Sequence, residues 1–85
     1  MNRAHTAFHL KEALEELQRT AASVESDLDY GDLEFSLAME HIYHHLNTAW
    51  NARGASDQRA RECTQEDFEA WRRFPSDLLS GALDA

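Results

Sequence analysis

The strongest constraint on the fold is a repeat of apolar side chains in the first third of the chain. These side chains recur at alternating intervals of three and four residues from residue 7 to residue 28. A heptad pattern of this kind lies along one face of an α-helix and favours packing against another helix. The repeat consists of Ala7, Leu10, Leu14, Leu17, Ala21, Val24 and Leu28. We therefore predict a helix over about residues 6–26, with Thr6 as its N-cap.

A second apolar stripe predicts a second helix over about residues 32–53. Asp32 is a suitable N-cap, and Gly54 suits the left-handed position that often ends a helix. The opposite side of this helix is interpreted as a solvent-facing surface. The stripe holds Phe35, Ala38, Met39, Ile42, Leu46, Ala49 and Trp50, and the opposite side holds Glu40, His44, Asn47 and Asn51. The short connection between the two helices predicts an antiparallel hairpin.

A short third helix is predicted over about residues 64–74. Thr64 is its expected N-cap, and Pro75 disfavours helix at the residue before it. Phe68, Trp71 and Phe74 follow one another at intervals of three. The polar segment 55–63 is interpreted as a loop or a helical extension, and residues 80–85 as a frayed tail. The chain of 85 residues is thus expected to form one all-α domain.

The size of the predicted helices bears on how the chain assembles. Two amphipathic helices and a short third one cannot enclose a core on all sides. We therefore expect a homodimer in which two hairpins form a four-helix bundle. The alternative is a monomer in which Phe68, Trp71 and Phe74 close the open side.

The charge of the chain indicates which partners it can bind. The net charge of −8 argues against nucleic acids and anionic membranes, which require basic surfaces. Residues 11–40 hold nine acidic side chains against two basic ones. They form either an acidic surface for a basic protein partner or a solvated face that aids solubility. The candidate contact residues are Glu25, Asp27, Asp29, Tyr30, Asp32 and Glu34.

The N-terminal sequence and the cysteine content bear on localisation. The N-terminal segment shows no apolar stretch typical of a secretory signal, and no run approaches the length of a membrane span. Cys63 is the single cysteine, so no disulfide forms within the chain. A lone thiol is typical of a reducing compartment, and we expect a cytoplasmic protein.

Histidines form two pairs at helical spacing. His41 and His45 are four residues apart, and so are His5 and His9. A pair at this spacing can chelate a divalent metal. In an antiparallel hairpin the start of the first helix lies near the end of the second, which brings His9 toward His45. His41, His45 and His9 are therefore candidate metal ligands, and the alternative is that these rings merely pack at the margin of the apolar stripe.

The motifs of metal and nucleotide enzymes do not occur in the sequence. It contains neither His-Glu-x-x-His nor the repeated Glu-x-x-His of di-metal bundles, and no glycine-rich phosphate loop. We therefore expect no catalysis and no required cofactor. The leading hypothesis is a non-enzymatic interaction module or regulator. A metal-binding bundle and an acidic inhibitor of a basic partner are the alternatives.

Overall fold

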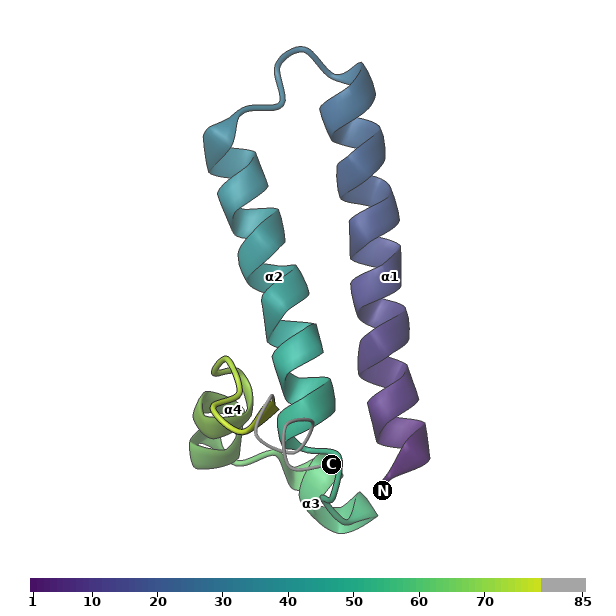
Figure 1. Ribbon diagram of the computed structural model, residues 1–85, viewed down its shortest axis with the longest axis vertical. Coiled ribbons are helices and arrows are strands. Elements are labelled where there is room, and N and C mark those ends of the chain that lie inside the picture. The colour runs from purple at the N-terminus through teal and green to yellow at the C-terminus, as the bar shows by residue number, and fades with distance from the viewer. Residues whose placement is uncertain (79–85) are drawn as a thin grey trace.

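The computed structural model describes residues 1–78 and is built from two long antiparallel helices with two short helices at one end (Figure 1). The helices are α1 (Arg3–Ser26), α2 (Asp32–Asn51), α3 (Asp57–Glu62) and α4 (Gln65–Trp71). The predicted all-α class and the hairpin are confirmed. The tail predicted over residues 80–85 lies outside the described residues. Over residues 1–78, none of the helices combines the length and apolarity needed to cross a membrane.

The start of α1 is fixed by Asn2. Its side-chain carbonyl accepts a hydrogen bond from the His5 backbone N–H (3.2 Å), while its amide donates to the Ala55 carbonyl (3.0 Å). The Asn2 backbone N–H also donates to the Arg53 carbonyl (2.6 Å). The prediction of Thr6 as the N-cap was wrong, because these long-range bonds let Asn2 cap the helix and place Thr6 inside it. The same bonds tie the N-terminus to the chain that follows α2.

The turn between α1 and α2 forms the tip of the hairpin. The Asp27 carboxylate accepts a hydrogen bond from the Asp29 N–H (3.0 Å), and the Glu34 carboxylate accepts one from the Gly31 N–H (2.9 Å). Helix α2 begins at Asp32, as predicted, although Gly31 occupies the N-cap position. Each of these bonds joins residues at most three positions apart, so local hydrogen bonds stabilise the turn of residues 27–31.

The end of α2 differs from the prediction. The helix ends at Asn51, and the Arg53 guanidinium donates to the Trp50 carbonyl (2.8 Å). Gly54 does not adopt the predicted left-handed conformation. The left-handed residue is Cys63, with φ of 36°, at the C-terminus of α3. The Arg53 side chain thus donates a hydrogen bond to a carbonyl at the end of α2. In many other helices a turn with a left-handed glycine satisfies these last carbonyls.

Helices α3 and α4 are held together by an ion pair. The Arg59 guanidinium of α3 lies 2.8 Å from the Asp67 carboxylate of α4, and Asp67 is buried. Thr64 caps α4 as predicted, since its hydroxyl accepts from the Asp67 N–H (3.1 Å). Segment 55–63 contains a helix, which settles the alternative left open by its polar sequence. The short pair α3–α4 is therefore held by polar contacts more than by a core of its own.

The core of the described chain is small. No large side chain is fully buried, and three of the five buried apolar residues are alanines: Ala13, Ile42, Ala49, Ala52 and Trp71. The hairpin is elongated (Figure 1), and many large apolar side chains of residues 1–78 stay exposed.

Candidate functional site

Helix α1 buries two small side chains against α2. Ala13 and Thr20, seven residues apart and therefore on one side of α1, are both buried. Small side chains at the contact allow the two helix axes to approach closely. The leucines of the heptad repeat lie beside this contact and stay about half exposed. The repeat predicted from the sequence is therefore real, but the chain's own second helix covers it only in part.

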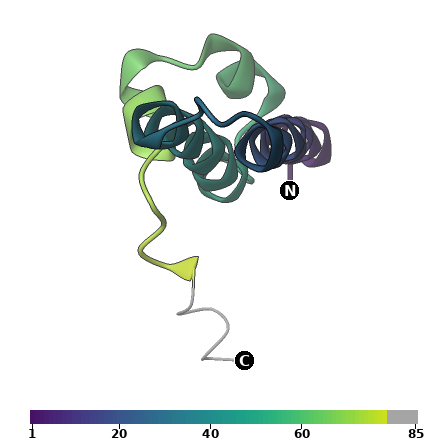
Figure 2. The same cartoon turned by 90° about the horizontal axis from the view of Figure 1, so that it is seen from above.

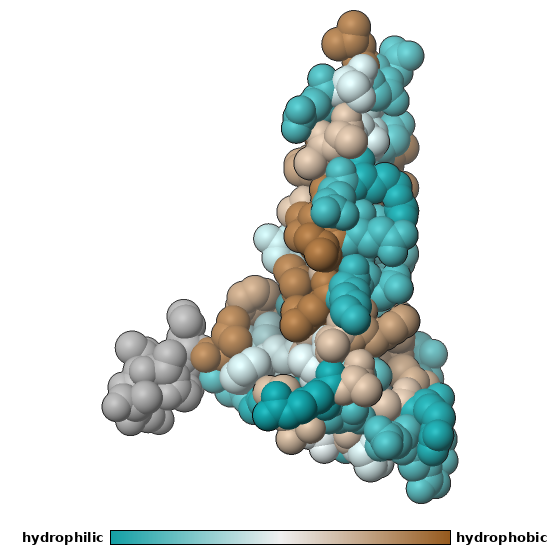
Figure 3. All heavy atoms as spheres, turned by 90° about the vertical axis from the view of Figure 1, so that its right-hand side faces the viewer, coloured by the Kyte–Doolittle hydropathy of each residue, from teal (hydrophilic) through white to brown (hydrophobic). Residues whose placement is uncertain are grey.

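The uncovered side chains form an apolar stripe along the hairpin (Figure 3). Leu14, Leu17 and Val24 are 54%, 45% and 56% exposed, and Leu28 at the tip is fully exposed. Helix α2 adds the exposed side chains of Phe35 and Leu46. The apolar stripe, as the term is used below, consists of Leu10, Leu14, Leu17, Val24, Leu28, Phe35 and Leu46.

A shallow groove lies between the two helices at the end of the apolar stripe nearest the N-terminus. It encloses about 200 Å³ and is lined by Leu10 of α1 and by Leu46 and Trp50 of α2, among others. The Arg53 guanidinium lies 3.8 Å above the Trp50 ring and also lines the groove. Leucines from both helices therefore belong to one continuous surface.

The aromatic side chains of the third predicted helix do not cover this surface. Helix α4 packs against another side of α2, where Trp71 is buried and Phe68 is half-buried beside the His44 ring (5.1 Å between ring centroids). Phe74 is 69% exposed and lies after the end of α4. Phe68 and Trp71 thus pack over one side of the hairpin, as the monomeric alternative expects, whereas Phe74 does not, and the choice between monomer and dimer stays open. The open side of the hairpin stays open in the single chain.

The docking of α4 depends on two asparagines that the sequence interpretation placed on a solvent face. Asn47 is buried, and its amide donates to the Arg72 carbonyl (2.8 Å). The Asn51 amide donates to the carbonyls of Trp71 (2.9 Å) and Arg73 (2.7 Å). The last carbonyls of a helix have no hydrogen-bond donors within the helix. The side-chain amides of Asn47 and Asn51 donate to carbonyls at and just after the end of α4. An asparagine pair four residues apart, ahead of a short helix, is the signal that was missed.

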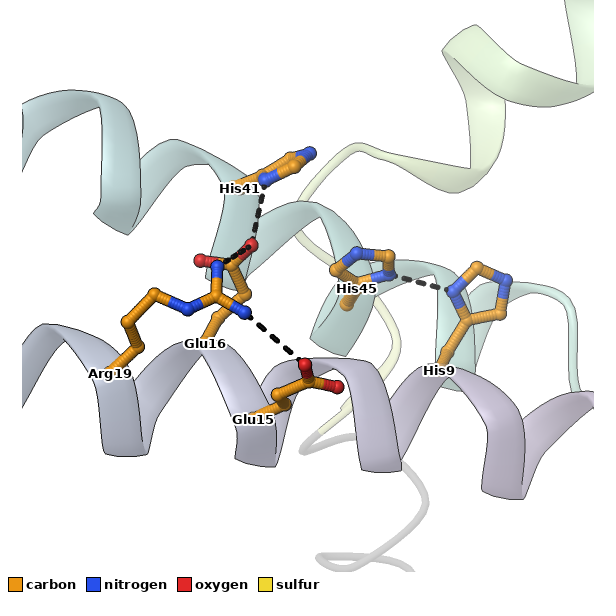
Figure 4. Close-up of polar contacts among 6 residues, drawn as sticks. All are labelled: His9, Glu15, Glu16, Arg19, His41 and His45. Carbon is orange, nitrogen blue, oxygen red and sulfur yellow. Dashed lines mark hydrogen bonds and ion pairs between the residues drawn. The ribbon is translucent and has the colours of Figure 1, made fainter.

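The five histidine rings lie close together, and Figure 4 shows His9 of α1 meeting His45 of α2. His9 Nδ1 lies 3.0 Å from His45 Nδ1, and His9 Nε2 lies 3.2 Å from His5 Nε2. Each contact needs one N–H and one bare nitrogen, so a neutral His9 donates to one neighbour and accepts from the other. The predicted approach of His9 to His45 across the hairpin is confirmed as a contact.

Burial makes the histidines harder to protonate. Burial, followed by repulsion from His5, His45 and His44, lowers the pKa of His9 from 6.5 to about 4. Burial also lowers the pKa of His44 and of His45, and neighbouring histidines contribute in the same direction. The rings of His9, His44 and His45 therefore resist protonation more than a free imidazole does.

His41, the third candidate metal ligand, points to a different partner. Its Nδ1 lies 3.2 Å from the Glu16 carboxylate, which also lies 3.6 Å from the Arg19 guanidinium (Figure 4). Over residues 1–78, no three His, Cys, Asp or Glu side chains are placed to hold a metal ion together. His9 and His45 present two close nitrogens, and the metal hypothesis for His41, His45 and His9 stays a prediction.

A cavity of about 210 Å³ lies between the histidines and the short helices. Its lining includes Phe8, Phe68 and Trp71 together with His5 and His44. The Nδ1 atoms of His5 and His44 are buried and have no hydrogen-bond partner among residues 1–78. A ligand in this cavity would therefore meet ring faces more than accessible polar atoms.

The predicted acidic contact residues lie together at the tip of the hairpin. All of them are exposed except Tyr30, which is half-buried. None of the five carboxylates belongs to an ion pair of residues 1–78. Hydrogen bonds from backbone N–H groups lower the pKa of Glu34. The set consists of Glu25, Asp27, Asp29, Tyr30, Asp32 and Glu34, and we call it the acidic tip.

Comparison with known proteins yields no match, whether to family models, curated sequences or solved structures.

Proposed function

We propose that the protein is a non-enzymatic protein–protein interaction module that self-associates through the apolar stripe. One observation carries the proposal: α1 buries Ala13 and Thr20 against α2 and leaves the leucines of its heptad repeat about half exposed. A regular heptad repeat is typical of a helix that packs along its length against another helix. In this hairpin the helix that would complete the packing has to come from another chain.

The amount of uncovered surface favours a second copy as that chain. The seven side chains of the apolar stripe are each at least 39% exposed in the single hairpin. A standard protein–protein interface removes about 800 Å² from each partner and has an apolar centre, which this stripe offers. Leu14, Leu17 and Val24 are about half exposed, and burying the remainder stabilises by about 1 kcal/mol for each. Two hairpins packed stripe to stripe form a four-helix bundle.

The polar side chains that the fold buries support an interaction role over catalysis. Asp67 is held by Arg59, and Asn47 is occupied by the end of α4. A catalytic acid or base has to reach a substrate, whereas these groups already have structural partners within the chain. The apolar stripe and the acidic tip remain uncovered within residues 1–78, and both suit association with protein.

Size-exclusion chromatography with light scattering tests the proposal. We expect the wild-type chain to be a dimer across micromolar to millimolar concentrations. Leu17→Glu places a charge in the middle of the stripe and should give a monomer or an unfolded chain. Gln18→Glu is the matched control, because it adds the same charge to the same helix at an exposed position outside the stripe. We expect this control to remain dimeric and helical by circular dichroism.

A wild-type protein that is monomeric throughout the concentration range would contradict the proposed self-association. A dimer that dissociates equally in Leu17→Glu and Gln18→Glu would contradict the assignment of the interface to the apolar stripe.

A further inference from the structure

We propose, on the basis of the self-association proposed above, that the second copy packs antiparallel, so that the acidic tip of each hairpin lies against the arginine-rich base of its partner. The base is the end of the hairpin that carries the N-terminus, α3 and α4 (Figure 1). The basic partner of the acidic tip is then a second copy of this chain.

The distribution of charge along the hairpin favours this orientation. Residues 25–40 hold six acidic side chains and no basic one. Six of the eight basic side chains lie at the base, either near the start of α1 or after the end of α2. Four of these six belong to no ion pair of residues 1–78. A parallel dimer would place the same unpaired carboxylates side by side, which is unfavourable, whereas an antiparallel dimer pairs them with arginines. The four arginines without an ion pair in residues 1–78 are Arg3, Arg53, Arg61 and Arg73.

Two of these arginines lie at the base end of the apolar stripe. Arg3 precedes Leu10 by seven residues and therefore lies on the same side of α1. Arg53 lines the groove that also contains Leu10. At the other end, Glu25 and Asp27 lie beside the last apolar positions of the heptad repeat. Because Leu10 and Val24 are about 21 Å apart along the axis of α1, an antiparallel partner brings its tip carboxylates toward Arg3 and Arg53 as the stripes align.

The chain after α4 gives an independent reason. The Asp77 carboxylate accepts a hydrogen bond from the Trp50 indole N–H (2.9 Å), so this segment contacts the base of α2 next to the groove of the stripe. Figure 2 shows the segment leaving the hairpin on the side opposite α3. In a parallel dimer the segments of both copies would compete for the same end of the interface. In an antiparallel dimer they lie at opposite ends.

Distances between spin labels distinguish the two orientations. In a Cys63→Ser background, a label on Asp29→Cys marks the tip of each copy. Helix α1 has 24 residues and is about 36 Å long, so we expect tip-to-tip distances of about 35 Å or more. A label on Gln18→Cys, at mid-length and outside the stripe, is the control. Its separation is similar in both orientations and reports that the labelled protein is dimeric.

A dimer with tip-to-tip distances below about 20 Å, the separation expected for adjacent helix pairs, would overturn the antiparallel orientation while leaving the proposed self-association intact. The absence of an intermolecular distance for both labels would contradict self-association itself. The two failures are therefore distinguishable.

Charge reversal tests the pairing of tip and base. We expect Arg3→Glu with Arg53→Glu to weaken the dimer about ten-fold or more at low salt, and Glu25→Lys with Asp27→Lys to do the same. The chain that carries all four substitutions should recover most of the affinity, because each junction then again pairs opposite charges. A four-fold variant weaker than either pair would overturn the proposed pairing.

Discussion

Acidification should destabilise the fold through the histidine cluster. A group whose pKa is lower in the folded state than in the unfolded chain is protonated preferentially in the unfolded chain. The pKa of His9 falls from 6.5 to about 4 on folding. Acidification therefore lowers the free energy of unfolding from about pH 6.5 downward, and this decrease ends at about pH 4. His44 and His45 shift in the same direction and add to the loss.

The magnitude follows from the shift at His9. Without screening, the pKa shift of His9 would lower the free energy of unfolding by about 2 kcal/mol between about pH 7.5 and about pH 5. Solvent reaches part of the His9 ring, so screening reduces this to about 1 kcal/mol. For a chain of this size, such a loss lowers the midpoint of thermal unfolding by about 4–8 °C.

Thermal unfolding followed by circular dichroism at fixed ionic strength and protein concentration measures the effect. His9→Gln removes the most strongly shifted group and should flatten the dependence of the midpoint on pH. His41→Gln is the matched control, because that exposed ring lies beside Glu16 at the edge of the cluster, and it should keep most of the dependence. A wild-type midpoint that stays constant or rises on acidification to about pH 5 would refute the reasoning.

Three further predictions concern the short helices and the metal hypothesis. Asn47→Ala leaves the Arg72 carbonyl without its donor and should lower the free energy of unfolding by about 1–3 kcal/mol in urea titrations, and an unchanged value would show that α4 docks without this bond. Arg59→Gln removes the charge beside the Asp67 carboxylate, whose pKa is held low mainly by that guanidinium. It should therefore raise the pKa of Asp67 in NMR titrations, and an unchanged pKa would contradict the pairing. The proposed dimer uses no metal, so dialysis against a chelator should leave the mass in light scattering unchanged; a loss that zinc reverses would instead support His9 and His45 as ligands.

The sequence predicts the two long helices well because their patterns are local. The alternation of three and four residues indicates which side chains share a face of α1, and the turn residues 27–31 indicate where the chain reverses. The contact between His9 and His45 could also be foreseen, since antiparallel pairing of two helices with known ends brings those positions to the same level.

The faces that the helices present could not be foreseen. Periodicity shows that Leu14 and Leu17 lie together, but it does not show that Ala13 and Thr20 would form the contact with α2 instead. The Asn2 cap depends on carbonyls more than fifty residues away in sequence. Helix α3 has a polar sequence and is held by the Arg59–Asp67 pair, a contact that no local pattern reveals.

Burial of the apolar stripe in the assembled protein tests the account most directly. A soluble paramagnetic agent broadens the methyl NMR signals of side chains that solvent can reach. Leu37 is 61% exposed and lines a groove beside Phe68 and Arg72 rather than the stripe, so it serves as the internal reference. At high protein concentration, we predict that the methyl groups of Leu14, Leu17 and Val24 are protected while those of Leu37 are broadened. Equal broadening of all four residues would contradict the account.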